Sequence, residues 1–154
     1  MRWIVLLFWL ALCYGVAWLG SAWTAPEIAG WYRTLIRPGF APPNWVFAPV
    51  WSLLYLLMAV AAWRICEAPP SSLRVWGLAL FLVQLALNLA WSWIFFHRHA
   101  IGAAGLEIVA LWAAIGGAIL LFARIRPGAA WLLVPYWAWV TFASALNWAY
   151  WRLN

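Results

Sequence analysis

Five long apolar stretches divide the chain, and short segments that hold most of the charged residues separate them. Each stretch is about 20 residues long, the length of helix that crosses the hydrocarbon core of a bilayer. The stretches are apolar on all sides, whereas the strands of a membrane barrel alternate between apolar and polar residues. The pattern predicts an all-α integral membrane protein, a single domain over residues 1–154 folded as a five-transmembrane-helix bundle. The expected spans are residues 3–22, 44–65, 74–96, 101–123 and 129–151.

Residues 23–43 form the one long connection, and they include Glu27, Arg33, Arg37 and four prolines. Loops of this length are uncommon in compact proteins and are often functional. We expect residues 28–36 to form a short interfacial helix that Pro38 stops, because proline breaks a helix. The last three connections are short, so the helices that they join should pack antiparallel.

Composition supports a membrane location and argues against nucleic-acid binding. Of the 154 residues, 69% are hydrophobic and 8% charged, whereas soluble domains are about half apolar and a quarter charged. The net charge is +6, but the arginines lie near the ends of apolar stretches, where they reach lipid headgroups. Five arginines fall on one side and four on the other, which leaves the orientation open. All nine cations are arginine, a bias that suggests a bacterial source and hence a cell-envelope membrane, inner or outer.

Several polar side chains lie inside the expected spans, where they are costly. Gln84, Asn88 and Ser92 follow one another at intervals of four and so share a helical face. Asn147 lies in the last span and Glu107 in the fourth. One interpretation is that the amides join helices by hydrogen bonds; the other is that they line a ligand cavity. For Glu107 we expect a structural role, with its carboxyl bonded to a neighbouring helix.

The chain has 17 tryptophans, more than two interfacial belts require. Trp51 and Trp139 fall well inside their spans. Trp51 shares a face with Tyr55, and Trp139 shares one with Ala143. Pockets for flat hydrophobic ligands are built in this way, from aromatic walls with a few polar groups.

Catalytic and metal-binding patterns are scarce. The three glutamates belong to separate regions, and there is no glycine-rich phosphate loop or nucleophile elbow. The cluster His97-Arg98-His99 falls on a short connection, where we expect a solvated turn and no metal site.

Three blocks of residues resemble the translocator protein family, also called tryptophan-rich sensory proteins or TspO/MBR proteins. Together they extend over nearly the whole chain. The first block is Trp31-Tyr32, Leu35, Arg37-Pro38, Pro42-Pro43, Trp45, Val50-Trp51 and Leu54-Tyr55; the second is Gln84 to Asn88, Trp91, Phe95 and Phe96; the third is Pro135-Tyr136, Trp139, Phe142-Ala143, Leu146-Asn147 and Trp151-Arg152.

The resemblance implies a five-helix bundle, usually a homodimer, that binds porphyrins, haem-like tetrapyrroles and other small hydrophobic ligands beneath the first loop. It implies no obligatory cofactor. Arg33 or Arg37 could meet a ligand carboxylate at the loop. Phe40 and Trp93 depart from the family pattern, and Glu107 stands where Asp is frequent. The ligand-binding positions that the resemblance implies are Tyr32, Trp51, Gln84, Asn88, Trp139 and Ala143.

Three further expectations concern activity and partners. A sensor or receptor is the leading interpretation; a transporter of lipophilic molecules and a light-dependent porphyrin-degrading enzyme, with Trp51 and Trp139 as redox partners, are the alternatives. Leu146, Tyr150 and Arg152 fit a proposed sterol-binding pattern. For the dimer we expect small residues of the third span to form the interface. These are Ala79, Ala86 and Ala90.

Overall fold

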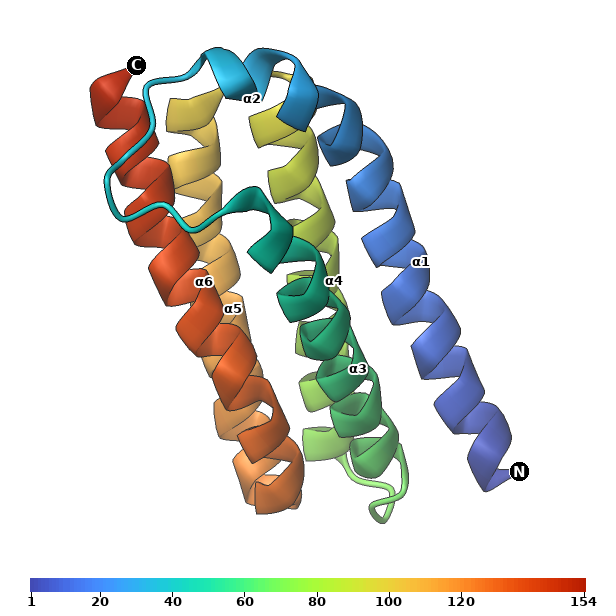
Figure 1. Cartoon of the computed structure of the whole chain (residues 1–154). Helices are drawn as coiled ribbons and strands as arrows, with labels where there is room; N and C mark the ends of the chain where they lie inside the picture. The colour runs from blue at the N-terminus through green and yellow to red at the C-terminus, as the bar shows by residue number, and fades with distance from the viewer.

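The computed structural model describes residues 1–154 and consists of five long helices side by side, with no strand (Figure 1). All five are long and apolar enough to cross a membrane, so the predicted five-helix bundle is confirmed. Their bounds are α1 (Arg2–Ala29), α3 (Phe47–Cys66), α4 (Ser72–Ser92), α5 (Ile101–Ile125) and α6 (Pro127–Leu153). The short pieces are α2 (Trp31–Thr34), the 3-10 turn η1 (Asn44–Val46) and the π-helical turn η2 (Trp93–His97).

The first helix is longer than the sequence pattern predicts. It continues past residue 22 to Ala29 and holds Pro26 inside it, so residues 23–27, which were expected to be loop, are helical. Proline is tolerated in membrane helices because the freed carbonyl can be satisfied by neighbouring groups. The expected helix at 28–36 is reduced to α2, which ends at Thr34 ahead of Pro38.

The other helix ends lie within three residues of their predicted positions when η1 is counted with α3 and η2 with α4. Local signals account for two of the starts. The Ser71 hydroxyl accepts a 3.1 Å hydrogen bond from the backbone N–H of Arg74 and so caps α4. Pro127 is the first residue of α6, where its missing N–H costs nothing.

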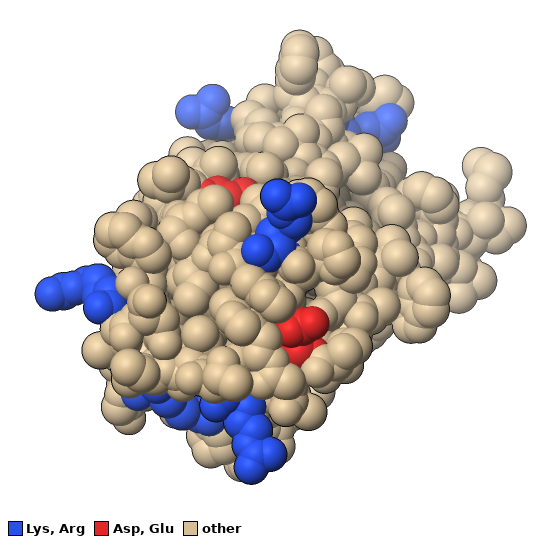
Figure 2. All heavy atoms as spheres, turned by 90° about the horizontal axis from the view of Figure 1, so that it is seen from above, with Lys and Arg blue, Asp and Glu red and all other residues tan.

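Buried side chains between the helices form a core of 21 residues, while large apolar side chains cover the outside. Trp18 is 71% exposed and Leu106 69% exposed, an arrangement that suits contact with lipid and not with water. Figure 2 looks onto the end of the bundle that the segment after α1 covers, where a few charged side chains are scattered among uncharged ones. The exterior therefore matches a bundle embedded in a bilayer.

The segment after α1 crosses one end of the bundle and forms its roof (Figure 1). The side chain of Asn154, at the chain's end, bonds both the N–H of Ile36, at 2.7 Å, and its carbonyl, at 3.1 Å. His99, between α4 and α5, stacks on Trp31 with ring centroids 4.1 Å apart. Its Nε2 lies 2.9 Å from Oε2 of Glu27. These contacts fix α2 over the space between the helices.

Candidate functional site

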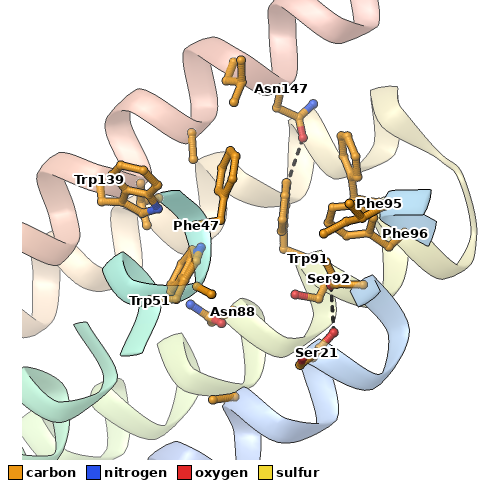
Figure 3. Close-up of a pocket in the computed structure, with 18 of the residues that line it drawn as sticks. Ser21, Phe47, Trp51, Asn88, Trp91, Ser92, Phe95, Phe96, Trp139 and Asn147 are labelled. Atoms are coloured by element: carbon orange, nitrogen blue, oxygen red, sulfur yellow. Dashed lines mark hydrogen bonds between the residues drawn. The ribbon is translucent and has the colours of Figure 1, made fainter. Parts of the chain in front are cut away.

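A cavity of about 420 Å³ lies between the helices beneath α2, which we call the aromatic cavity. Its volume is in the range of small-molecule sites, and 19 of its 27 lining residues are hydrophobic. Aromatic rings form two opposing walls (Figure 3). One wall holds Phe47, Trp51 and Trp139, and the other holds Trp91, Phe95 and Phe96.

The rings of each wall support one another. Phe47 meets Trp139 edge to face at 5.9 Å between centroids. Trp51 meets Tyr136 in the same manner at 6.1 Å. On the other wall, Trp91 stacks on Phe95 at 5.0 Å. Such pairs are held in preferred geometries, so the walls present fixed flat faces to a guest.

A chain of hydrogen bonds forms the floor of the cavity. The Tyr55 hydroxyl donates to Oδ1 of Asn88 at 2.7 Å, and Nδ2 of Asn88 donates to the Tyr136 hydroxyl at 2.8 Å. The Tyr136 hydroxyl donates in turn to Oε1 of Gln84 at 2.8 Å, while Nε2 of Gln84 lies 3.9 Å from the sulfur of Met58. The chain joins α3, α4 and α6 through groups that would be costly to bury alone.

A second amide joins three helices at the other end of the cavity. Oδ1 of Asn147 accepts a 3.0 Å bond from the indole N–H of Trp91, and its Nδ2 donates to the carbonyl of Ile101 at 2.9 Å (Figure 3). Asn147 thereby ties α6 to α4 and α5 and fixes the orientation of the Trp91 ring.

Two tyrosines meet at the roof of the cavity. The Tyr150 hydroxyl, on α6, donates a 2.7 Å bond to the hydroxyl oxygen of Tyr32, on α2. Above them lies a smaller cavity of about 290 Å³, which we call the upper cavity; Arg33 and Arg37 contribute to its lining.

On one side the aromatic cavity reaches the surface between α1 and α3. Several of its lining residues there are exposed, among them Ser21 on α1 and Ala48 on α3. One hydrogen bond crosses this opening, from the Tyr14 hydroxyl to the carbonyl of Ser52 at 2.8 Å. Both helices are long and apolar enough to cross a membrane, so an opening between them would face lipid in a bilayer.

Five of the six expected ligand-binding residues line the aromatic cavity: Tyr32, Trp51, Asn88, Trp139 and Ala143. Gln84 differs, because it lies beneath the lining and is bonded to Tyr136. Whether the lining residues bind a ligand stays a prediction.

The opposite aromatic wall was not identified as a site from the residues alone. Trp91, Phe95 and Phe96 occur in the family blocks, and Trp91 follows Asn88 by three residues and so lies near its helical face. Phe47 carried no such signal, since it begins α3 next to the loop.

Two of the three sterol candidates face inward. Leu146 is 7% exposed and Tyr150 2% exposed, and both line the aromatic cavity, whereas Arg152 is exposed. The three residues therefore do not present one lipid-facing surface.

The expected hydrogen bond from Glu107 to a neighbouring helix is absent, and this prediction is wrong. Both carboxyl oxygens are buried and have no hydrogen-bond partner. The buried amide groups of the bundle bond to other partners: Asn88 donates to Tyr136 and Asn147 to Ile101. Glu107 does not line the aromatic cavity.

The two histidines make local contacts. His97 stacks near Trp93 at 6.0 Å, and His99 is held by Glu27 and Trp31. No group of three potential metal-ligating side chains comes together in the structure.

A comparison with known proteins identifies the family to which this architecture belongs. The family model described as TspO/MBR matches residues 9–152. The chain belongs to the TspO/MBR family. It is 40% identical over 147 residues to tryptophan-rich protein TspO of Chlorobaculum tepidum, covering 94% of this chain and 92% of that protein. It is 34% identical over 154 residues to the tryptophan-rich sensory protein of Cereibacter sphaeroides, covering 100% and 94%. It is 35% identical over 138 residues to the human translocator protein, covering 88% and 82%.

Membership in the TspO/MBR family and the five apolar helices identify a multi-pass membrane protein with a role of the receptor or transporter type. The family thus agrees with a bundle that encloses a ligand-sized cavity.

Proposed function

We propose that this TspO/MBR protein is a membrane sensor that binds tetrapyrroles, such as protoporphyrin IX and haem-like molecules, and other flat hydrophobic ligands. The observation that supports this function is the aromatic cavity, whose walls hold Trp51 and Trp139 on one side and Trp91 on the other. Flat rings gain most from stacking between such faces. Bacterial relatives and the arginine-only composition favour a bacterial cell-envelope membrane as its location.

Ligand binding would depend more on the fit of the ligand's shape to the cavity than on hydrogen bonds. Ala143 leaves room on α6 where a larger side chain would project into the cavity. Asn88 is already bonded to two tyrosines, so the floor is rigid. A flat guest would enter from the lipid through the opening between α1 and α3 and lie between the walls.

Titration of the purified protein with protoporphyrin IX in the dark tests this function. Binding should quench tryptophan fluorescence, because porphyrin absorption overlaps indole emission. Trp51→Ala and Trp139→Ala should each weaken binding about threefold to tenfold. Trp18→Ala is the matched control, since Trp18 is 71% exposed on the outer face of α1. Equal affinity in the parent and in both cavity variants would show that the ligand does not bind between these walls.

The same preparation separates the two alternatives. A transporter would carry porphyrin across sealed vesicles, and loss of flux in Trp51→Ala would support transport through this cavity. A porphyrin-degrading enzyme would convert the absorption spectrum of the ring in light but not in the dark. Saturable binding with neither flux nor conversion is the result expected for a sensor.

A further inference from the structure

The aromatic cavity and the upper cavity adjoin one another, but their chemistry differs. Four residues line both, and they form the boundary: Ile28, Tyr32, Asn44 and Tyr150. Below the boundary the lining is mainly aromatic and aliphatic. Above it, two of the seven lining residues are arginines, Arg33 and Arg37. A ligand that crossed the boundary would have an apolar body below and a polar end above.

The two arginines differ in what they already contact. The Arg37 guanidinium donates to the carbonyl of Pro42 and, at 3.4 Å, to Oδ1 of Asn44, so it holds the loop in place. Arg33 makes no side-chain hydrogen bond or ion pair. The acidic side chains do not compete for it: Glu27 pairs with His99, Glu67 pairs with Arg2, and Glu107 lies within α5 with no hydrogen-bond partner. Arg33 therefore presents an unpaired cation to the upper cavity.

The tyrosine pair at the boundary supplies an unused donor. Tyr150 and Tyr32 each carry one O–H group, but a single hydrogen bond of 2.7 Å joins them. Whichever hydroxyl donates in this bond, the other O–H remains free to donate to a ligand. With Tyr150 as donor, the free O–H is that of Tyr32.

Tyr32 stays a donor at neutral pH. Burial is the main cause that raises its pKa above the ordinary value of a tyrosine, and the hydrogen bond with Tyr150 acts in the same direction. The nearby charge of Arg37 opposes both effects and is the weaker influence. The hydroxyl is therefore neutral and would not repel an anion.

We propose that the upper cavity is a carboxylate subsite, in which Arg33 and the free hydroxyl of the Tyr32–Tyr150 pair bind an acidic group of the ligand. This inference rests on the proposed function, because the flat apolar body of the same ligand fills the aromatic cavity below. Guanidinium and carboxylate form bidentate, charge-assisted hydrogen bonds that are stronger than neutral ones. The subsite should therefore favour flat aromatic carboxylic acids over neutral hydrophobic molecules of the same shape.

The test compares protoporphyrin IX with its dimethyl ester, which keeps the ring and loses the negative charges. Both are titrated in the dark, in uncharged detergent, by tryptophan quenching. The parent should bind the free acid about tenfold more tightly than the ester, the difference expected for a charged hydrogen bond. Arg33→Gln should remove that preference by weakening acid binding and leaving ester binding unchanged. Tyr32→Phe keeps the ring and should weaken only acid binding, about threefold to tenfold.

Arg98→Gln is the matched control, because it removes the same charge at the same end of the bundle. Arg98 lies over the Trp93 ring, 5.5 Å from its centroid, and lines neither cavity. It should leave the binding of both molecules unchanged. Unchanged ester binding in each variant also shows that the aromatic cavity remains folded.

The outcomes separate this inference from the proposed function. Equal affinity for acid and ester in the parent, or an equal loss of acid binding in Arg98→Gln, would overturn the carboxylate subsite. If Trp51→Ala still weakened the binding of both molecules in that case, the aromatic cavity would remain the proposed binding site. Failure of both molecules to bind the parent would overturn the proposed function and the subsite together.

Discussion

The hydroxyl of Tyr55 donates a 2.7 Å hydrogen bond to Oδ1 of Asn88 and so joins α3 to α4 at the floor of the aromatic cavity. The other end of the same amide donates to Tyr136 on α6. Asn88 is therefore a structural residue as well as a lining residue. Its position fixes the distance between the helices that carry Trp51 and Trp139.

Replacing Asn88 by leucine should destabilise the fold. The change leaves the hydroxyls of Tyr55 and Tyr136 without their amide partner inside the bundle. An unsatisfied buried polar group costs about 1–3 kcal/mol. The free energy of unfolding should therefore fall by more than the ~0.6 kcal/mol that a single membrane hydrogen bond contributes on average. Reversible unfolding in detergent would measure this change in the free energy of unfolding. Tyr55→Phe removes one bond only and should cost less; a larger loss in Tyr55→Phe than in Asn88→Leu would contradict this assignment.

Glu107→Leu should stabilise the protein, which reverses the usual effect of changing a charged residue. Both carboxyl oxygens are buried and unpartnered, and removing an unsatisfied polar group recovers its desolvation cost, about 1–3 kcal/mol. Porphyrin affinity should not change, because Glu107 does not line the cavity. Glu107→Gln keeps polar atoms at the site and should recover less. A fall in the unfolding temperature of Glu107→Leu would indicate that the carboxyl has a partner in the assembled protein.

Periodicity predicted the helices and the shared face of Gln84 and Asn88, because both follow from spacing along one helix. Which of the two amides reaches the cavity could not be predicted in this way. That outcome depends on where the hydroxyls of Tyr55 and Tyr136 arrive from other helices. The first span was expected to end at residue 22, because the apolar pattern weakens there, yet α1 continues through Pro26 to Ala29.

The sequence pattern also could not predict contacts between segments that are distant along the chain. Tyr32 and Tyr150 lie at opposite ends of the chain, and no local signal pairs their hydroxyls. Phe47 faces Trp139 only because α3 begins beside the middle of α6. The family blocks identified Tyr32 and Trp139 as site residues, whereas the partners of each came from the packing of the helices.

A bulky residue at Ala86 should disrupt the predicted homodimer. Ala79 and Ala86 are exposed on α4, so this face is open to a second copy, whereas Ala90 is half-buried. Small residues allow close approach of helix backbones, and Ala86→Phe would prevent it. Light scattering should show half the protein mass of the parent. Ala113→Phe makes the same change at an exposed alanine of α5 and should leave the mass unchanged. Equal masses for the parent and Ala86→Phe would remove α4 from the interface.

Tyr14→Phe should speed ligand exchange through the opening between α1 and α3. It removes the hydrogen bond to the Ser52 carbonyl that crosses this opening and keeps the aromatic ring. Stopped-flow quenching should show faster association and faster dissociation of protoporphyrin, with a smaller change in affinity, because the walls remain intact. Trp18→Phe, on the lipid-facing side of the same helix, should leave both rates unchanged. Unaltered rates in Tyr14→Phe would mean that ligands enter by another route.

Ala143→Phe should block the aromatic cavity without unfolding the protein. Ala143 lines the cavity from α6, so a phenyl ring there would occupy space that the ligand needs. The phenyl ring would exclude part of the ligand, so porphyrin binding should weaken about tenfold or more, equivalent to about 1.4 kcal/mol or more of binding free energy. Ala145→Phe is the matched control, because Ala145 lies two residues away and is exposed on the outer face of α6. It should bind as the parent does. Helical content and unfolding temperature should be preserved in both variants, since the added ring enters an open cavity in one and lipid in the other. Parent-like affinity in a folded Ala143→Phe variant would place the ligand away from α6, and the wall that contains Trp139 would then not be part of the site.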